Sequence, residues 1–109
     1  MNEVIKSLHQ HRSIRKFKDL AVDKDLMISL ITAGQSAASS SFLQGVTIIR
    51  VTDCEKRAAF KEITGGQAYV ETAPEFLVFC ADLSRSMRCC SAHGGTSAEG
   101  LTEHFIIAT

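Results

Sequence analysis

The residues best suited to chemistry form a basic cluster near the start of the chain, at positions 11–17. Between residues 4 and 18 the sequence has five Lys or Arg and no acidic residue, although the whole chain balances twelve basic against twelve acidic side chains. Arg12 and Arg15 flank Ser13 and Ile14, so both guanidinium groups can reach one phosphate together with the Ser13 hydroxyl. This pattern predicts a local anion site, and a solvated basic loop is the alternative.

A second group of polar side chains is the serine run Ser39, Ser40 and Ser41. Consecutive serines are poor helix formers, but they offer hydroxyls and accessible backbone to a ligand at close range. The run leads directly into Phe42 and Leu43, which favours a structured loop. A flexible serine-rich linker is the alternative.

The cysteines do not indicate a metal site. The four of them, Cys54, Cys80, Cys89 and Cys90, show no regular framework. Structural zinc needs ligand pairs separated by a few residues, and the adjacent Cys89 and Cys90, followed by His93, have no second pair. We therefore expect reduced thiols and no metal ion. The sequence also contains no recognisable nucleophile–base pair or carboxylate dyad.

Composition limits the class of protein. The 109 residues suit one domain, and 45% hydrophobic content is that of a globular chain. Zero net charge argues against a general nucleic-acid or membrane-surface binder. No apolar run approaches the roughly 20 residues of a membrane helix, and the N-terminus lacks the layout of a secretion signal. We expect a cytoplasmic protein.

Three helices are predicted to position these groups. Asn2 caps a short helix with an apolar face, and Asp23 caps a second, amphipathic one. A capping box over residues 52–55, from Thr52 to Glu55, opens a third helix that Gly65 and Gly66 end. Residues 67–71 then form a turn or short element before Pro74.

Two strands and a long connection complete the expected elements. Residues 46–51 are rich in β-branched side chains, and residues 75–81 are apolar on both faces, which predicts a central buried strand with Cys80 as a core filler. Residues 82–95 have no period, so we expect a mobile connection. A second capping box, at residues 96–99, is predicted to open a helix with Leu101 and Phe105 on one stripe.

Five segments together resemble the N-terminal part of the FMN-dependent nitroreductases, in particular the oxygen-insensitive NADPH nitroreductases and NADPH–flavin oxidoreductases. These segments are HRSIRKF at 11–17, AASSSFLQ at 37–44, RVTD at 50–53, GGQAYV at 65–70 and EFLVFCAD at 75–82. The resemblance implies an α+β fold in which helices pack on a central, mainly antiparallel sheet. Residues 102–109 resemble the start of the family's long central helix.

The resemblance also implies roles for individual residues. His11, Arg12, Ser13 and Arg15 correspond to residues that hold the phosphate and ribityl end of FMN. Ser39, Ser40 and Ser41 correspond to the loop beside the flavin ring and the partner subunit of a homodimer, and Gln67 and Tyr69 to positions near the ring or ribityl chain. Taken singly, Gln67 could also close a turn, and Tyr69 could be a partly buried aromatic residue.

The implied activity is ping-pong reduction. NADPH, the co-substrate, reduces FMN by hydride transfer, and a nitroaromatic, a quinone or a free flavin then accepts two electrons. Family members are about twice as long, so we expect residues 1–109 to be a partial nitroreductase domain, a truncated product or fragment with impaired turnover. The alternatives are an inactive flavin-binding remnant and a small interaction module.

Overall fold

The structure is a computed structural model, and it describes residues 2–96. These residues form two compact units, which are treated separately below. Unit 1 combines residues 2–20 with residues 53–74, and unit 2 combines residues 21–52 with residues 75–96. The expected capping box at 96–99 and the helix after it lie outside the described residues.

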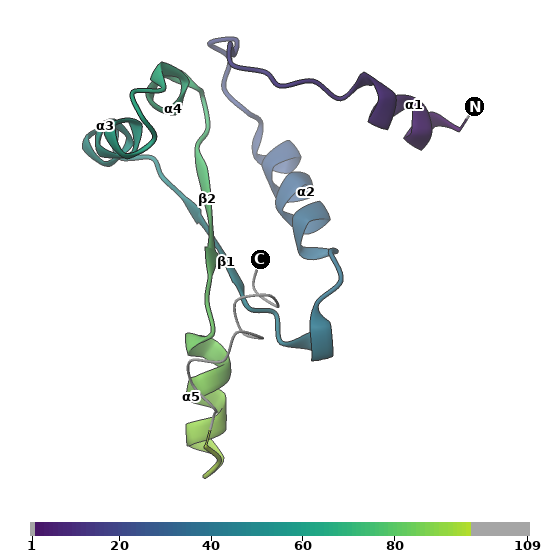
Figure 1. The fold of residues 1–109 in the computed structure, drawn as a ribbon, viewed down its shortest axis with the longest axis vertical. Helices are drawn as coiled ribbons and strands as arrows, with labels where there is room; N and C mark the ends of the chain where they lie inside the picture. The colour runs from purple at the N-terminus through teal and green to yellow at the C-terminus, as the bar shows by residue number, and fades with distance from the viewer. Residues whose placement is uncertain (1, 97–109) are drawn as a thin grey trace. The chain divides into compact units, whose positions relative to one another are not determined.

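Unit 1 contains three helices: α1 (Glu3–Gln10), α3 (Cys54–Ile63) and α4 (Ala68–Thr72). The N-cap of α1 is Asn2, as predicted, and its side chain accepts a hydrogen bond from the Val4 N–H at 2.8 Å. Helices α3 and α4 lie side by side (Figure 1). Val70 of α4 is buried, with 4% of its surface exposed.

The predicted capping box is wrong by one residue. The N-cap of α3 is Asp53, whose carboxylate accepts a hydrogen bond from the Lys56 N–H at 2.9 Å. The Val51 N–H is still bonded to the Phe76 carbonyl. Backbone pairing between the strands therefore extends to Val51, and the helix cap falls at Asp53, one residue after Thr52.

The Gly65-Gly66 pair ends α3, as predicted. The Gly66 N–H donates to the Lys61 carbonyl at 2.9 Å and the Gly65 N–H donates to the Glu62 carbonyl at 3.1 Å, which is a Schellman arrangement. Gly65 has a φ of 77°, in the left-handed region that L side chains rarely adopt. The two glycines thus turn the chain directly from α3 into α4.

We expect Gly65→Ala to lower the free energy of unfolding by about 1 kcal/mol, because the new side chain strains a left-handed backbone. The control is Gly34→Ala within α2, where a Cβ would meet nothing within 4 Å and φ is not left-handed. That change should be neutral or slightly stabilising. Urea denaturation followed by far-UV circular dichroism measures both, and equal effects would contradict the capping role.

Unit 2 is organised by an antiparallel pair of strands, β1 (Val46–Arg50) and β2 (Leu77–Ala81). The two strands lie side by side (Figure 1), and the register runs from Val46 opposite Ala81 to Arg50 opposite Leu77. The other elements are α2 (Lys24–Gln35), the 3-10 helix η1 (Ser40–Phe42) and α5 (Ser84–Ala92). The mixture of helices and antiparallel strands agrees with the expected α+β class.

The two strands are less enclosed than predicted. Among the described residues β2 pairs only with β1, and its side chains are half-buried or exposed. Phe79 is 62% exposed, so within the described part of the chain β2 is not a central buried strand. Cys80 is only half-buried there, so it does not fill a core as predicted. An apolar sequence shows that a strand can be buried, but burial itself needs elements on both faces.

The predicted mobile connection over residues 82–95 is also wrong, because most of it is helix α5. The Asp82 carboxylate accepts hydrogen bonds from the Ser84 N–H at 2.9 Å and from the Ser84 hydroxyl at 2.6 Å, so it organises the first turn. Thr47 of β1 donates its hydroxyl to the same carboxylate at 2.5 Å. Cys89 and Cys90 therefore lie on a helix, exposed to solvent.

The hydroxyls of Ser84 and then Thr47 lower the pKa of Asp82 from 3.8 to about 2. A lowered pKa means that the folded state favours the carboxylate, so this stabilisation is present above pH 3.8 and is lost as the pH falls through about 2. We therefore expect Asp82→Asn to lower the urea midpoint at neutral pH. The difference from the parent chain should shrink as the pH approaches about 2.

The control for Asp82 is Asp19→Asn, which removes an exposed carboxylate that makes no hydrogen bond among the described residues. Its urea midpoint should follow that of the parent chain at every pH. A constant, pH-independent loss of stability in Asp82→Asn would contradict the carboxylate role.

Candidate functional site

The basic stretch begins where α1 ends. His11 is the C-cap of α1, and its N–H donates to the Leu8 carbonyl at 3.2 Å. One guanidinium nitrogen of Arg12, Nη1, donates to the His9 carbonyl at 3.0 Å and to the His11 carbonyl at 2.7 Å. Arg12 thus covers the C-terminal carbonyls of α1, where a cation is favourable. Its other N–H groups make no hydrogen bond among the described residues.

Ser13 and Arg15 leave their donors open to solvent. Both residues are exposed, and neither has a hydrogen bond or ion pair among residues 2–96. Because the stretch also lacks acidic side chains, no carboxylate within it competes for the guanidinium groups. This set of donors suits an anionic group such as a phosphate.

The structure brings the end of the basic stretch to Tyr69. The rings of Phe17 and Tyr69 lie 6.1 Å apart between centroids, tilted by 59°, which is within the usual range for aromatic pairs. Tyr69 is half-buried, and Phe17 is half-exposed. Two segments more than fifty residues apart in the sequence therefore meet in unit 1.

Gln67 lies at the N-cap position of α4. Its side chain makes no capping bond, but its Nε2 donates to the Thr64 carbonyl at 3.0 Å. Gln67 therefore does close the turn between α3 and α4, which was the alternative interpretation of this residue. Its amide oxygen makes no hydrogen bond among the described residues and can still accept one from a ligand.

The serine run belongs to unit 2 and forms the tight turn η1. The Ser39 hydroxyl accepts a hydrogen bond from the Gln44 N–H at 2.8 Å. Ser41, Phe42 and Gln44 all have φ near +50°, which is unusual for residues other than glycine. The run is thus an ordered, strained loop and not a flexible linker, and strain of this kind is common where a loop serves a ligand.

An open depression of about 640 Å³ lies beside this loop in unit 2. Its lining includes Ile31, Ser39, Ile48, Phe79 and Arg85. Arg85 of α5 donates through Nη2 to the Gln44 carbonyl at 2.8 Å, so it closes one side of the serine loop. The sequence does not indicate this contact, because its pattern over residues 82–95 shows no helical period and Arg85 lies 41 residues from Gln44.

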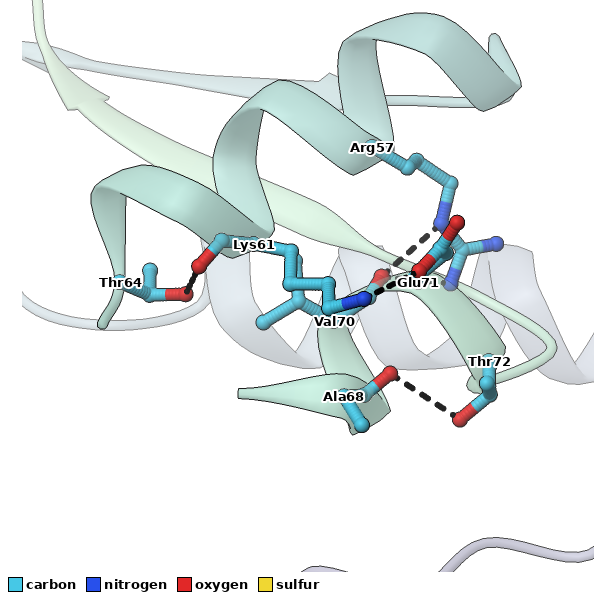
Figure 2. A network of polar contacts seen from close by, with 7 residues as sticks. All are labelled: Arg57, Lys61, Thr64, Ala68, Val70, Glu71 and Thr72. Carbon is cyan, nitrogen blue, oxygen red and sulfur yellow. Dashed lines mark hydrogen bonds and ion pairs between the residues drawn. The ribbon is translucent and has the colours of Figure 1, made fainter. Parts of the chain in front are cut away.

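Polar contacts tie α4 to α3, and the sequence did not indicate them either. Arg57 and Lys61 of α3 both reach across to α4, as Figure 2 shows. Arg57 donates to the Val70 carbonyl, and Lys61 pairs with Glu71 at 3.0 Å. The hydrogen bond and the charge of Glu71 raise the pKa of Lys61. Only a structure reveals such contacts, because the partners lie ten or more residues apart.

The predicted site residues are thus divided between the two units. His11, Arg12, Ser13, Arg15, Gln67 and Tyr69 belong to unit 1, and Ser39, Ser40 and Ser41 belong to unit 2. Within residues 2–96 no group of three His, Cys, Asp or Glu side chains is arranged to hold a metal ion. The four cysteines are free thiols, and no helix of the described part is long and apolar enough to cross a membrane.

Comparison with known proteins identifies the family. The profile of the nitroreductase family matches residues 8–106. The chain therefore belongs to the nitroreductase family, as the five segments indicated.

Individual proteins similar to this chain support the same family assignment. The chain is 51% identical to the NADPH-flavin oxidoreductase of Vibrio harveyi over 85 residues, which cover 78% of this chain and 35% of that protein. It is 47% identical to the oxygen-insensitive NADPH nitroreductase of Salmonella typhimurium over 90 residues, covering 83% and 38%. The structure of the Vibrio harveyi NADPH:FMN oxidoreductase complexed with NAD+ matches with a TM-score of 0.87 and 43% identity, over 98% of this chain and 45% of that one. The chain thus spans less than half the length of these relatives.

Proposed function

We propose that this chain carries the phosphate-binding and part of the ring-binding residues of an FMN-dependent NAD(P)H oxidoreductase. The carrying observation is the basic stretch, whose open donors suit a phosphate and whose Phe17 contacts Tyr69. The names of the relatives, which refer to flavin, FMN and NADPH, support the same assignment. Because the relatives are more than twice as long as this chain, the activity of the whole enzyme is part of the proposal.

The proposed contacts follow from the donor set. Arg12, Ser13 and Arg15 would hold the FMN phosphate, with His11 at the ribityl end. Gln67 would offer its amide oxygen, Tyr69 its ring and hydroxyl, and Ser39, Ser40 and Ser41 their hydroxyls. All of these groups position the cofactor, and none of them needs to be a nucleophile or a base.

When bound, FMN would supply the redox chemistry, namely two-electron transfer from NAD(P)H to a nitroaromatic, a quinone or a free flavin in a ping-pong sequence. The chain's own residues would bind and orient the cofactor. This division explains why the sequence lacks a catalytic dyad.

The test of the proposed function is to purify the chain, measure its flavin content and follow NADPH oxidation with a nitroaromatic acceptor. Yellow, active protein supports the enzyme, yellow and inert protein supports FMN binding alone, and a colourless protein without affinity for FMN overturns the proposal.

We expect Arg15→Ala to weaken FMN binding by about 1–3 kcal/mol, the scale of a lost charge-assisted hydrogen bond. Arg12→Ala should do the same and also loosen the end of α1, because Arg12 bonds two of its carbonyls. Fluorescence titration with FMN measures both changes. Lys18→Ala is the control, since it removes a nearby positive charge outside residues 11–15. Unchanged affinity in both arginine variants would refute the phosphate role.

We also propose that the protein is a homodimer. Val4, Ile5 and Leu8 are exposed on one side of α1, and Leu8 is 71% exposed. Exposed apolar surface of this kind favours association. Sedimentation velocity should show concentration-dependent self-association, and Leu8→Gln should reduce it more than Ile63→Gln, which changes an exposed side chain on α3. A monomer at all concentrations would contradict the proposal.

A further inference from the structure

Helix α4 carries Tyr69, yet it is too short to be stable alone. It has five residues, between the Gly65-Gly66 turn and Pro74. With five residues it has little more than one turn of backbone bonds; at its end the Ala73 N–H donates to the Tyr69 carbonyl at 2.9 Å, and the Thr72 hydroxyl donates to the Ala68 carbonyl at 3.2 Å. One helical turn does not recover the cost of nucleation in water. Contacts from outside α4 must therefore hold Tyr69 in place.

Arg57 supplies the main contact. Its Nε and Nη2 donate to the Val70 carbonyl at 3.0 and 2.9 Å, and Nη2 also donates to the Ala73 carbonyl. A helix leaves its last carbonyls without internal partners, and an arginine is well suited to bind them. Val70 is 4% exposed and Ala73 is 9% exposed, so water has little access to replace the guanidinium. Arg57 therefore satisfies backbone groups that would otherwise be buried without a partner.

A second contact comes from one turn further along α3. Lys61 pairs with Glu71 at 3.0 Å, on the same side of α3 as Arg57, because residues four apart share one face (Figure 2). This pair is half-exposed, and a flexible ammonium group sets no strict geometry. The planar guanidinium of Arg57, which binds two carbonyls, is the contact that specifies where α4 lies.

We propose that Arg57 is a positioning residue of the FMN site. Its guanidinium holds the carbonyls at the end of α4, and this places Tyr69 against Phe17 at the end of the basic stretch. The cofactor part of this inference depends on the proposed function. The placement of Tyr69 does not, and it can be measured without FMN.

The chain offers a direct probe, because Tyr69 is its only tyrosine and it has no tryptophan. Tyrosine fluorescence, its quenching by acrylamide and the near-UV circular dichroism all report mainly on Tyr69. We expect Arg57→Met, which keeps length but removes every donor, to increase quenching and to weaken the near-UV signal. FMN affinity should fall by about tenfold, the effect of one hydrogen bond lost between a displaced Tyr69 and the cofactor. Arg57→Lys should be intermediate, since one ammonium group cannot reproduce the planar fork.

Lys56→Ala is the matched control, because it removes a positive charge from an exposed neighbour on the same helix. It should leave the Tyr69 signals and the FMN affinity unchanged. If Arg57→Met does not fold by far-UV circular dichroism, Arg57→Lys carries the test. Unchanged Tyr69 signals in the folded Arg57 variant would overturn the positioning role.

The failure of this proposal and the failure of the proposed function give different results. If the parent chain binds FMN and the Arg57 variants match it in both affinity and Tyr69 signals, the positioning role is wrong and the FMN site stands. If the parent chain does not bind FMN, the FMN site is wrong, and the Tyr69 signals alone decide whether Arg57 places Tyr69.

Discussion

The antiparallel pairing of β1 with β2 is the interaction on which the rest of the described structure depends. Five residues of each strand pair in register, and the pairing continues to the Val51 N–H and the Phe76 carbonyl at one end. Near the same end, the Arg50 guanidinium donates two hydrogen bonds to the Glu75 carboxylate, at 2.8 and 2.5 Å. At the other end, the Asp82 N–H reaches the Gly45 carbonyl. The ladder thereby brings together positions about 25 to 37 residues apart in the sequence.

This pairing also makes residues 53–74 a closed excursion that leaves one strand and returns to the other. The excursion contains α3 and α4, and its stability depends on satisfying backbone groups that the short α4 leaves open. The Gly65-Gly66 turn satisfies the end of α3 with backbone bonds, and Arg57 satisfies the end of α4 with a side chain. The same physical requirement, that the last carbonyls of a helix need donors, thus acts twice within twenty residues.

The chemistry that we propose for the chain is that of positioning a cofactor. Its basic stretch offers donors without competing carboxylates, and its serine loop offers hydroxyls on a strained, ordered backbone. Neither group is reactive by itself, which agrees with the proposal that a bound cofactor carries the reaction. The candidate site residues could be chosen from the sequence because they form contiguous segments, and their role in binding stays a prediction. The contacts from Arg57 and Arg85 could not, because their partners lie 13 to 41 residues away.

The sequence by itself determined the local elements. Asn2 and Asp23 cap their helices through bonds that span two or three residues, Gly65 and Gly66 stop α3, and β-branched residues form β1. Only the tertiary structure decided the rest. Helix α5 begins where Thr47, on another strand, helps to hold the Asp82 carboxylate, and the exposure of Phe79 depends on which elements cover β2. Capping and turns depend on neighbours along the chain, whereas burial and long-range hydrogen bonds depend on partners that the chain supplies only once it has folded.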